Sequence, residues 1–399
     1  MFSPRTHAST FVLEGLNALG TSWYFYYIYF FLSERFGFGP QENLLFGVAH
    51  GAIYVVGSFL GGRLGQRRGY LGTARLGFGG MAAAFAAGAL LEGRPGGGAA
   101  LVAGQVAVMV AATVAVCLTW ANLEALVSEG LEGPRLQRNL GIYNLVWAGG
   151  NAVAFFVGGA LIERLGFGVI FWLPAGLMAV MTLLATFVGR GGVLRLAGGT
   201  GHGHVAPAAE RRHADRAPKA FLRMAWLANP CAYIAISAAV PVIPALAARF
   251  DLGTAAAGAF ASLWFFVRFI VFGLLWRWSG WHYRFRWLLV AYVAMVAGFL
   301  GIFTLPTLAL VAAAQVLFGA GVGLIYYSSL FYSMDVGATK GEHGGIHEAA
   351  LGAGILAGPL IGAAAKLARP DSFAAPAWAV SAALAAGLAG VWWLRGRRR

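Results

Sequence analysis

The sequence predicts an all-α integral membrane protein with twelve transmembrane helices arranged as two pseudo-symmetric six-helix bundles. Three observations predict this fold: the composition, the spacing of apolar blocks and the distribution of basic residues. Of the 399 residues, 59% are hydrophobic and only 11% are charged, whereas about a quarter of the residues of a soluble protein are charged. This small number of charged residues cannot cover a surface that faces water. Most of the chain must therefore face lipid or other helices.

Apolar blocks of about twenty residues, the length that crosses a hydrocarbon layer of about 30 Å, occur six times in each half. In the first half they cover 9–32, 43–64, 73–91, 99–127, 142–162 and 168–188. In the second half they cover 221–247, 254–278, 287–305, 308–334, 345–366 and 374–394. The segment between them contains Gly, His and Arg without helical periodicity, which is typical of a flexible linker. The predicted domains are therefore an N-terminal six-helix bundle (1–188), a linker (189–219) and a C-terminal six-helix bundle (220–399).

The basic residues predict the orientation. Of the 29 lysines and arginines, 22 lie in alternate segments that include both chain ends and the linker, 6 lie in the remaining segments, and Arg268 lies inside an apolar block. By the positive-inside rule, both termini and the linker are cytoplasmic in the inner cell membrane. This distribution accounts for the net charge of +14 without a nucleic-acid partner. The first block is too long for a cleavable signal peptide.

The two halves resemble each other in sequence. RFGFG at 35–39 follows the first block and RFDLG at 249–253 follows the seventh, while GIYN at 141–144 and GIHE at 345–348 open the fifth and eleventh blocks. Gly150 and Gly354 follow at the same offset. Internal duplication of this kind predicts a cavity between the halves near the middle of the membrane.

Two short motifs carry a family resemblance. The segment 58–68 (SFLGGRLGQRR) is similar to the basic loop signature between the second and third helices of the major facilitator superfamily, with Gly62 where that family usually has an aspartate. The segment 354–363 (GILAGPLIGA) is similar to a glycine- and proline-containing motif of the family's antiporters. In those antiporters the motif lies in the fifth span, whereas here it lies in the eleventh. With the six-plus-six pattern, the whole chain resembles this superfamily. The resemblance implies alternating-access transport, with Arg67 and Arg68 of the loop as gating residues.

The predicted function is secondary active transport of a small organic solute by a monomer in the lipid bilayer, with proton coupling as a further expectation. Efflux of amphipathic or aromatic compounds is an alternative, disfavoured because the fourth span lacks the arginine of many proton antiporters. Alternatives from other classes are a membrane-embedded lipid-modifying enzyme and a sensor that binds without transporting. No phosphate loop, nucleophile elbow or helical zinc motif occurs, so the sequence predicts no enzyme, cofactor or metal site.

An ionisable side chain inside a span costs about 2.5–3.5 kcal/mol to insert, which makes it a functional candidate. Arg268, in the eighth block, is expected either to anchor an anionic or zwitterionic solute or to form a structural ion pair. Glu14, in the first block, is expected either to carry a coupling proton or to pair with a cytoplasmic arginine. Further side chains expected to bind substrate in the cavity are Trp23, Tyr27, Trp147, Asn151, Tyr326 and Tyr327.

Polar residues at matching places in the two halves predict a gate on the cytoplasmic side. These are Tyr143 and Asn144 in the fifth block and His347 and Glu348 at the start of the eleventh. Glu124 is expected to form an ion pair in the same gate. His50 is expected to pack against a backbone carbonyl, and Pro241 is expected to bend the seventh span because it removes a backbone donor.

Overall fold

The structure, a computed structural model, describes residues 4–96, 98–131, 133–191, 218–336 and 340–396. Within these ranges all the regular elements are helical, and eleven helical segments are long and apolar enough to cross a membrane. The helix α1 (Pro4–Phe36) lies beside them as a twelfth long segment. The prediction of an all-helical membrane protein is confirmed, and the count of twelve helices agrees approximately.

The first half of the chain forms α1, α2 (Pro40–Arg68), α3 (Tyr70–Glu92), α4 (Ala99–Val116), α5 (Trp120–Ser128), α6 (Gly133–Leu165) and α7 (Val169–Gly191). The second half forms α8 (Pro218–Ala239), the 3-10 turn η2 (Val240–Val242), α9 (Ile243–Arg249), α10 (Thr254–Ala261), α11 (Leu263–Arg277), α12 (Phe285–Thr304), α13 (Leu308–Val336), α14 (Lys340–Ala368) and α15 (Ala375–Gly396). Most of the predicted linker, 189–219, lies outside the described residues. The domain boundaries therefore remain a prediction.

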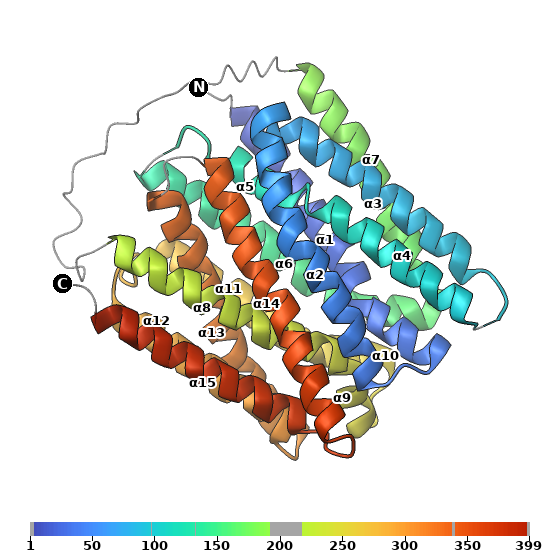
Figure 1. Cartoon of the computed structure of the whole chain (residues 1–399). Helices are drawn as coiled ribbons and strands as arrows, with labels where there is room; N and C mark the ends of the chain where they lie inside the picture. Colours follow the sequence, from blue (N-terminus) through green and yellow to red (C-terminus); the bar gives the residue numbers. More distant parts are fainter. Residues whose placement is uncertain (1–3, 97, 132, 192–217, 337–339, 397–399) are drawn as a thin grey trace.

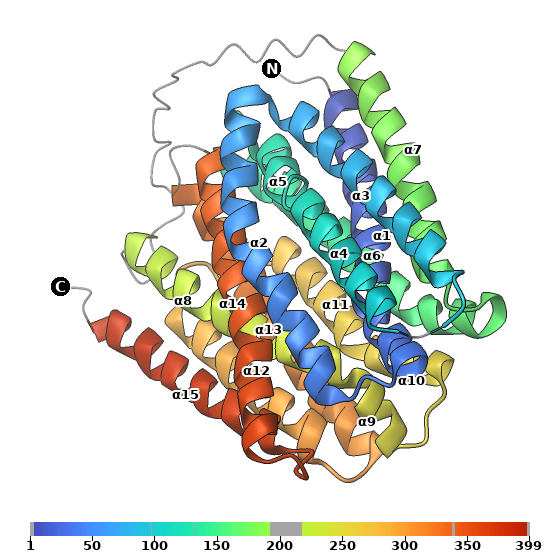
Figure 2. The ribbon, with the colours of Figure 1, turned by 45° about the vertical axis from the view of Figure 1, so that its right-hand side comes forward.

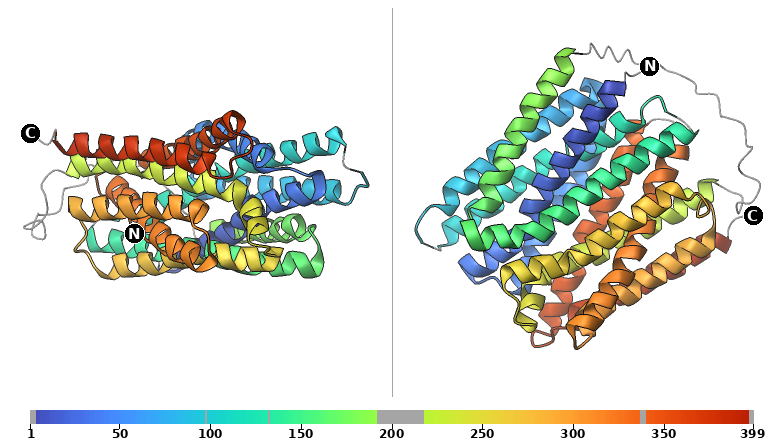
Figure 3. Two further views of the ribbon diagram at one scale, coloured as in Figure 1. Left: turned by 90° about the horizontal axis from the view of Figure 1, so that it is seen from below. Right: turned by 180° about the vertical axis from the view of Figure 1, so that it is seen from behind.

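The helices lie roughly side by side, with α1–α7 in one group and α8–α15 in the other (Figures 1 and 2). We call the end at which α1 begins and α15 ends the termini end, and the other the opposite end. Both groups meet along two seams, where α2 packs on α14 and α6 packs on α10 and α11. Views from below and behind show the same arrangement (Figure 3).

Glycine permits the close approach of α2 and α14. A Cβ atom added to Gly51 would lie 2.4 Å from the Cα of Leu356, so a larger residue would force the helices apart. The repeat predicted from Gly150 and Gly354 has a matching structural counterpart. Gly150 lets α6 approach α1, where an added Cβ would lie 3.1 Å from the Gly15 carbonyl oxygen, and Gly354 lets α14 approach α8 in the same manner.

The bend predicted at Pro241 is confirmed. The helix α8 ends at Ala239, and Pro241 lies in the 3-10 turn η2 that separates α8 from α9. Because proline offers no backbone N–H, the regular hydrogen-bond ladder cannot continue through it. The interruption turns Val240 and Pro241 toward a cavity described below.

The loop between α11 and α12 at the termini end is held by aromatic side chains. The His282 ring stacks on Phe331 with centroids 4.4 Å apart, and the Tyr283 hydroxyl donates a hydrogen bond of 2.5 Å to Asp335. Burial lowers the pKa of His282 to about 4, and the charge of Asp335 only partly opposes this effect. His282 is therefore neutral at pH 7.

This burial predicts an acid-sensitive contribution to stability. A histidine whose pKa is lower in the folded than in the unfolded protein stabilises the fold above about pH 6.5, and this contribution is lost as the pH falls toward 4. Between pH 7 and pH 5, His282→Gln is expected to lose less stability than the wild type, by about 2 kcal/mol. Thermal unfolding of both proteins in detergent at the two pH values measures this difference. Equal losses would show that His282 titrates normally.

Candidate functional site

A cavity of about 950 Å³, a volume that includes space open to solvent, lies between the two groups of helices. Both groups contribute to its wall, through α1, α2, α4, α5 and α6 on one side and α8, η2, α11, α13 and α14 on the other. Aromatic rings and a few polar groups dominate the lining, as is usual for small-molecule sites. The position agrees with the cavity expected from internal duplication.

Arg268 on α11 is the charged group of the cavity wall that lacks a carboxylate contact. Its guanidinium carbon lies 4.3 Å from the centroid of the Trp147 ring and 5.2 Å from that of Trp264. The side chain is 2% exposed, and neither Nε nor Nη2 has a hydrogen-bond partner among the described residues. Cation–π contact holds the guanidinium in place while leaving two donors available.

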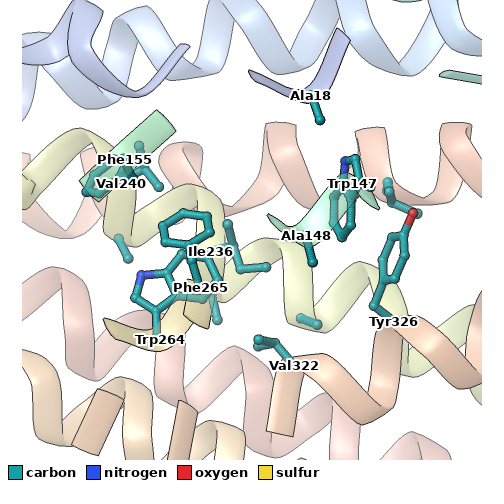
Figure 4. Packing of buried hydrophobic residues seen from close by; sticks show 14 of the residues in the cluster. Ala18, Trp147, Ala148, Phe155, Ile236, Val240, Trp264, Phe265, Val322 and Tyr326 are labelled. Carbon is teal, nitrogen blue, oxygen red and sulfur yellow. The ribbon is translucent and has the colours of Figure 1, made fainter. Parts of the chain in front are cut away.

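Stacked rings form one side of the cavity next to Arg268. Trp147 on α6 and Tyr326 on α13 lie face to face with centroids 4.6 Å apart (Figure 4). Phe272 continues the stack, 5.9 Å from Tyr326. Since α6 and α13 belong to different groups of helices, this stack also joins the two groups across the cavity.

Toward the termini end, the cavity is bounded by a buried acidic cluster, which we define as Glu14, Glu124, Tyr143, His347 and Glu348. Each of these side chains is at most 3% exposed. Glu348 lines the cavity and accepts a hydrogen bond of 2.5 Å from the Tyr54 hydroxyl. The carboxylates are close enough for their charges to repel one another.

Among the described residues, Glu14 and Glu124 do not form the ion pairs considered for this region. Neither carboxylate oxygen of Glu14 or Glu124 has a hydrogen-bond partner among the described residues. Within the same ranges, Arg268 is the only buried lysine or arginine. The expected ion pair of Glu124 is therefore wrong: its neighbours are Glu348 and His347, because the basic residues of the spans' ends lie outside the core.

Four of the predicted substrate residues line the cavity: Arg268, Trp147, Asn151 and Tyr326. Asn151 accepts a hydrogen bond from the Ser22 hydroxyl across the α1–α6 contact. Of the predicted gating residues, Glu348 also reaches the wall. His347 and Glu348 lie two turns inside α14, which begins at Lys340, rather than at its start.

Trp23, Tyr27 and Tyr327 are buried but do not line the cavity, which corrects their expected position. Tyr27 points to α6, where its hydroxyl donates a hydrogen bond of 2.5 Å to the Phe155 carbonyl. One residue along α1 rotates a side chain by about 100°, so Tyr26 lies on the wall instead. Glu14 is likewise buried beneath the cavity rather than on its wall.

Three further gating candidates and His50 are placed as follows. Arg67 and Arg68 are exposed at the end of α2, and their gating role stays a prediction. Asn144 is buried, with its Oδ1 lacking a partner among the described residues. His50 contacts a hydroxyl rather than a carbonyl, with Nδ1 2.8 Å from Thr113 Oγ1.

Several cavity residues were not predicted from the sequence. Tyr54, Trp120 and Tyr233 line the wall together with His50. A helix that is apolar all round gives no sign of which aromatic side chain faces inward. The one available signal was the isolated histidine in the second apolar block.

Comparison with known proteins places this geometry in a family. A sequence model of the Major Facilitator Superfamily matches residues 10–359. The chain belongs to this superfamily. It is therefore a multi-pass membrane transporter and not an enzyme, which removes the lipid-modifying alternative. No curated protein is similar enough in sequence to match it.

Solved structures of superfamily transporters share the fold of this chain. The human organic anion transporter MFSD10 (TETRAN) has 15% sequence identity and a TM-score of 0.69, with 98% of this chain and 100% of that chain covered. The proton:xylose symporter XylE, bound to 6-bromo-6-deoxy-D-glucose, has 13% identity and a TM-score of 0.68, with 98% and 96% covered. A mutant of the nucleoside transporter NupG has 12% identity and a TM-score of 0.68, with 99% and 100% covered. At such low identity these likenesses concern the fold alone.

Proposed function

We propose that the protein is a secondary transporter for a small organic solute that carries an anionic group, and that protons drive the transport. The observation that carries this proposal is Arg268, whose guanidinium has two unpartnered donors on the wall of a cavity shared by both halves. A buried donor without a partner is costly, and a carboxylate or phosphate group of a solute would satisfy it in a paired geometry. The stack of Trp147 and Tyr326 would hold an apolar or aromatic part of the same solute.

Alternating access is supported by contacts between the two halves on either side of the cavity. Toward the termini end, α5 of the first half contacts α14 of the second. Toward the opposite end, α1 contacts η2 and α9. Rocking of one half against the other would break one set of contacts while the other remains. The cavity is complete within one chain, in agreement with a monomer.

The test is a binding screen followed by flux. Purified protein in detergent is heated with organic acids, sugars, amino acids and amphipathic cations, and a ligand at about 100 times its dissociation constant stabilises the folded state by about 2.7 kcal/mol. We expect stabilisation by organic anions, and uptake of the same anions into proteoliposomes. Binding without uptake would indicate a sensor. Stabilisation by amphipathic cations alone would support the second candidate, efflux of aromatic compounds, which the ring-lined cavity favours.

We also propose that both termini are cytoplasmic in the inner membrane, as the excess of basic residues at the termini end predicts. The two native cysteines, Cys117 and Cys231, are buried, so single cysteines placed in exposed loops can be labelled selectively. In intact cells, a membrane-impermeant maleimide is expected to label Pro95→Cys at the opposite end. Gln66→Cys at the termini end is expected to react only after permeabilisation. The reverse pattern would invert the orientation.

A further inference from the structure

Three members of the acidic cluster form a compact set of metal-ligand atoms. A carboxylate oxygen of Glu124, a carboxylate oxygen of Glu348 and a ring nitrogen of His347 all lie within 4.8 Å of one another. Glu124 is on α5, whereas His347 and Glu348 are adjacent on α14. The set therefore joins the first half of the chain to the second, at the end of the cavity where α5 and α14 touch.

Two of the three side chains, Glu124 and His347, carry buried polar atoms without a hydrogen-bond partner among the described residues. Both carboxylate oxygens of Glu124 and Nε2 of His347 are buried without a hydrogen bond among the described residues. The two side chains are 1% and 0% exposed. Buried polar atoms are nearly always paired, so unpaired ones indicate an ion or a water that completes the site. The guanidinium of Arg268 lies instead against the rings of Trp147 and Trp264.

Neighbouring hydroxyl groups orient two of the three side chains, as second partners do around bound metals. The Tyr54 hydroxyl donates to one oxygen of Glu348, at 2.5 Å. Nδ1 of His347 lies 3.4 Å from Ser329 Oγ, which leaves Nε2 as the unpaired nitrogen. Because Glu348 also lines the cavity, an ion has a path from the cavity to the set.

We infer that Glu124, His347 and Glu348 bind a divalent transition-metal ion such as Zn²⁺. Two carboxylates and a neutral imidazole are balanced in charge by one divalent ion, and a mixed nitrogen and oxygen set is typical of Zn²⁺ and related metals. Mg²⁺ and Ca²⁺ prefer oxygen ligands alone. The ion bridges α5 and α14, so it stabilises the conformation in which these helices touch and holds the cavity closed toward the termini end. This site is additional to the proposed solute site at Arg268.

The binding experiment uses the purified full chain in detergent and no transported solute. Titration with Co²⁺ is expected to saturate at one ion per chain with visible absorption bands of a nitrogen and oxygen site, and Zn²⁺ is expected to displace it. Binding is also expected to release protons and to weaken in acid, because the ligands must be deprotonated. Glu124→Gln and His347→Gln are each expected to lower the affinity at least tenfold, and Tyr54→Phe is expected to lower it about 10- to 100-fold through Glu348.

The matched control is His50→Gln, which removes a partly buried histidine of the cavity wall that lies outside the set. This variant is expected to keep the wild-type affinity for the metal. A second control replaces His202 and His204, the two histidines closest to each other in the sequence, and is also expected to bind normally. Every variant must elute from size exclusion like the wild type, and Tyr54→Phe provides the test if a ligand variant unfolds. Failure of the wild type to bind Co²⁺ or Zn²⁺ would overturn the inference. Binding that survives His347→Gln and is lost with His202 and His204 would also overturn it.

A flux experiment separates this inference from the proposed function. Zn²⁺ at saturating concentration is expected to slow solute uptake at least tenfold in wild-type proteoliposomes and to leave uptake by His347→Gln unchanged. Metal binding without any solute flux would leave the metal site standing and count against transport. Normal flux that Zn²⁺ does not affect would count against the bridging role of the ion and leave transport standing.

Discussion

Replacement of Arg268 by alanine is expected to lower binding and uptake of an anionic solute at least 100-fold, equal to about 2.7 kcal/mol. Arg268 lines the cavity, and its Nε and Nη2 are buried without a hydrogen-bond partner among the described residues. Hydrogen bonds to charged groups contribute about 1.5–3 kcal/mol each. Loss of a fixed pair of such bonds accounts for the expected effect. Radiolabelled uptake into proteoliposomes and thermal-shift binding measure it.

The same variant is expected to fold normally. Arg268 lacks a carboxylate contact, so its removal leaves no opposite charge buried, and it ends the desolvation cost of the guanidinium itself. The thermal midpoint without ligand is therefore expected to stay the same or to rise. Arg268→Lys is the matched control, because it keeps the charge but not the planar fork, and intermediate binding is expected. An Arg268→Ala protein that fails to insert or unfolds would instead show that Arg268 has a structural role.

The spans and the proline turn were predictable because they depend on local sequence. An apolar block of twenty residues that crosses lipid forms a helix, because its backbone polar groups must pair with one another. Pro241 interrupts a helix because proline has no backbone N–H to donate. Arg268 was also identifiable, because a single arginine in an apolar block is costly to insert. Each of these features can be recognised from a short window of the chain.

The rotation of each helix about its own axis, which decides which side chains face the cavity, was not predictable in this way. The helix α1 carries aromatic residues on all sides from Trp23 to Tyr29, so the sequence gives no preference between Tyr26 and Tyr27 as the cavity residue. Their side chains differ by about 100° around the axis. The packing of α1 on α6 decides between them, through the hydrogen bond from Tyr27 to Phe155.

The acidic cluster depended on contacts between distant segments. Glu124 was expected to find a basic partner, but it meets His347 and Glu348, more than 200 positions away in the chain. Tyr54, which bonds Glu348 from 294 positions away, carried no signal of its own in the second block. The sequence repeat did pair Tyr143 with His347 and Asn144 with Glu348, although it did not show that Glu14 and Glu124 would join them.

Replacement of Glu14 by glutamine is expected to uncouple transport from protons while leaving exchange of solute intact. Glu14 is fully buried, and both carboxylate oxygens lack hydrogen-bond partners among the described residues. A buried charged carboxylate without a partner is costly, whereas its protonated form is neutral, so this side chain can bind and release a proton as the cavity opens to either side. Glutamine keeps the shape and cannot titrate.

Proteoliposomes with an imposed pH gradient separate coupling from movement of solute. If one proton moves with each anion, the pair carries no net charge across the membrane. A gradient of one pH unit then supports a solute gradient of up to about tenfold. We expect this accumulation in the wild type and in Glu34→Gln, a matched control at the exposed opposite end of α1, and its loss in Glu14→Gln. Counterflow of labelled against unlabelled solute is expected to persist in all three. Accumulation by Glu14→Gln would show that another carboxylate carries the proton. Exchange needs a working cavity but no net proton movement. Loss of counterflow in Glu14→Gln would therefore assign Glu14 to solute binding or to packing.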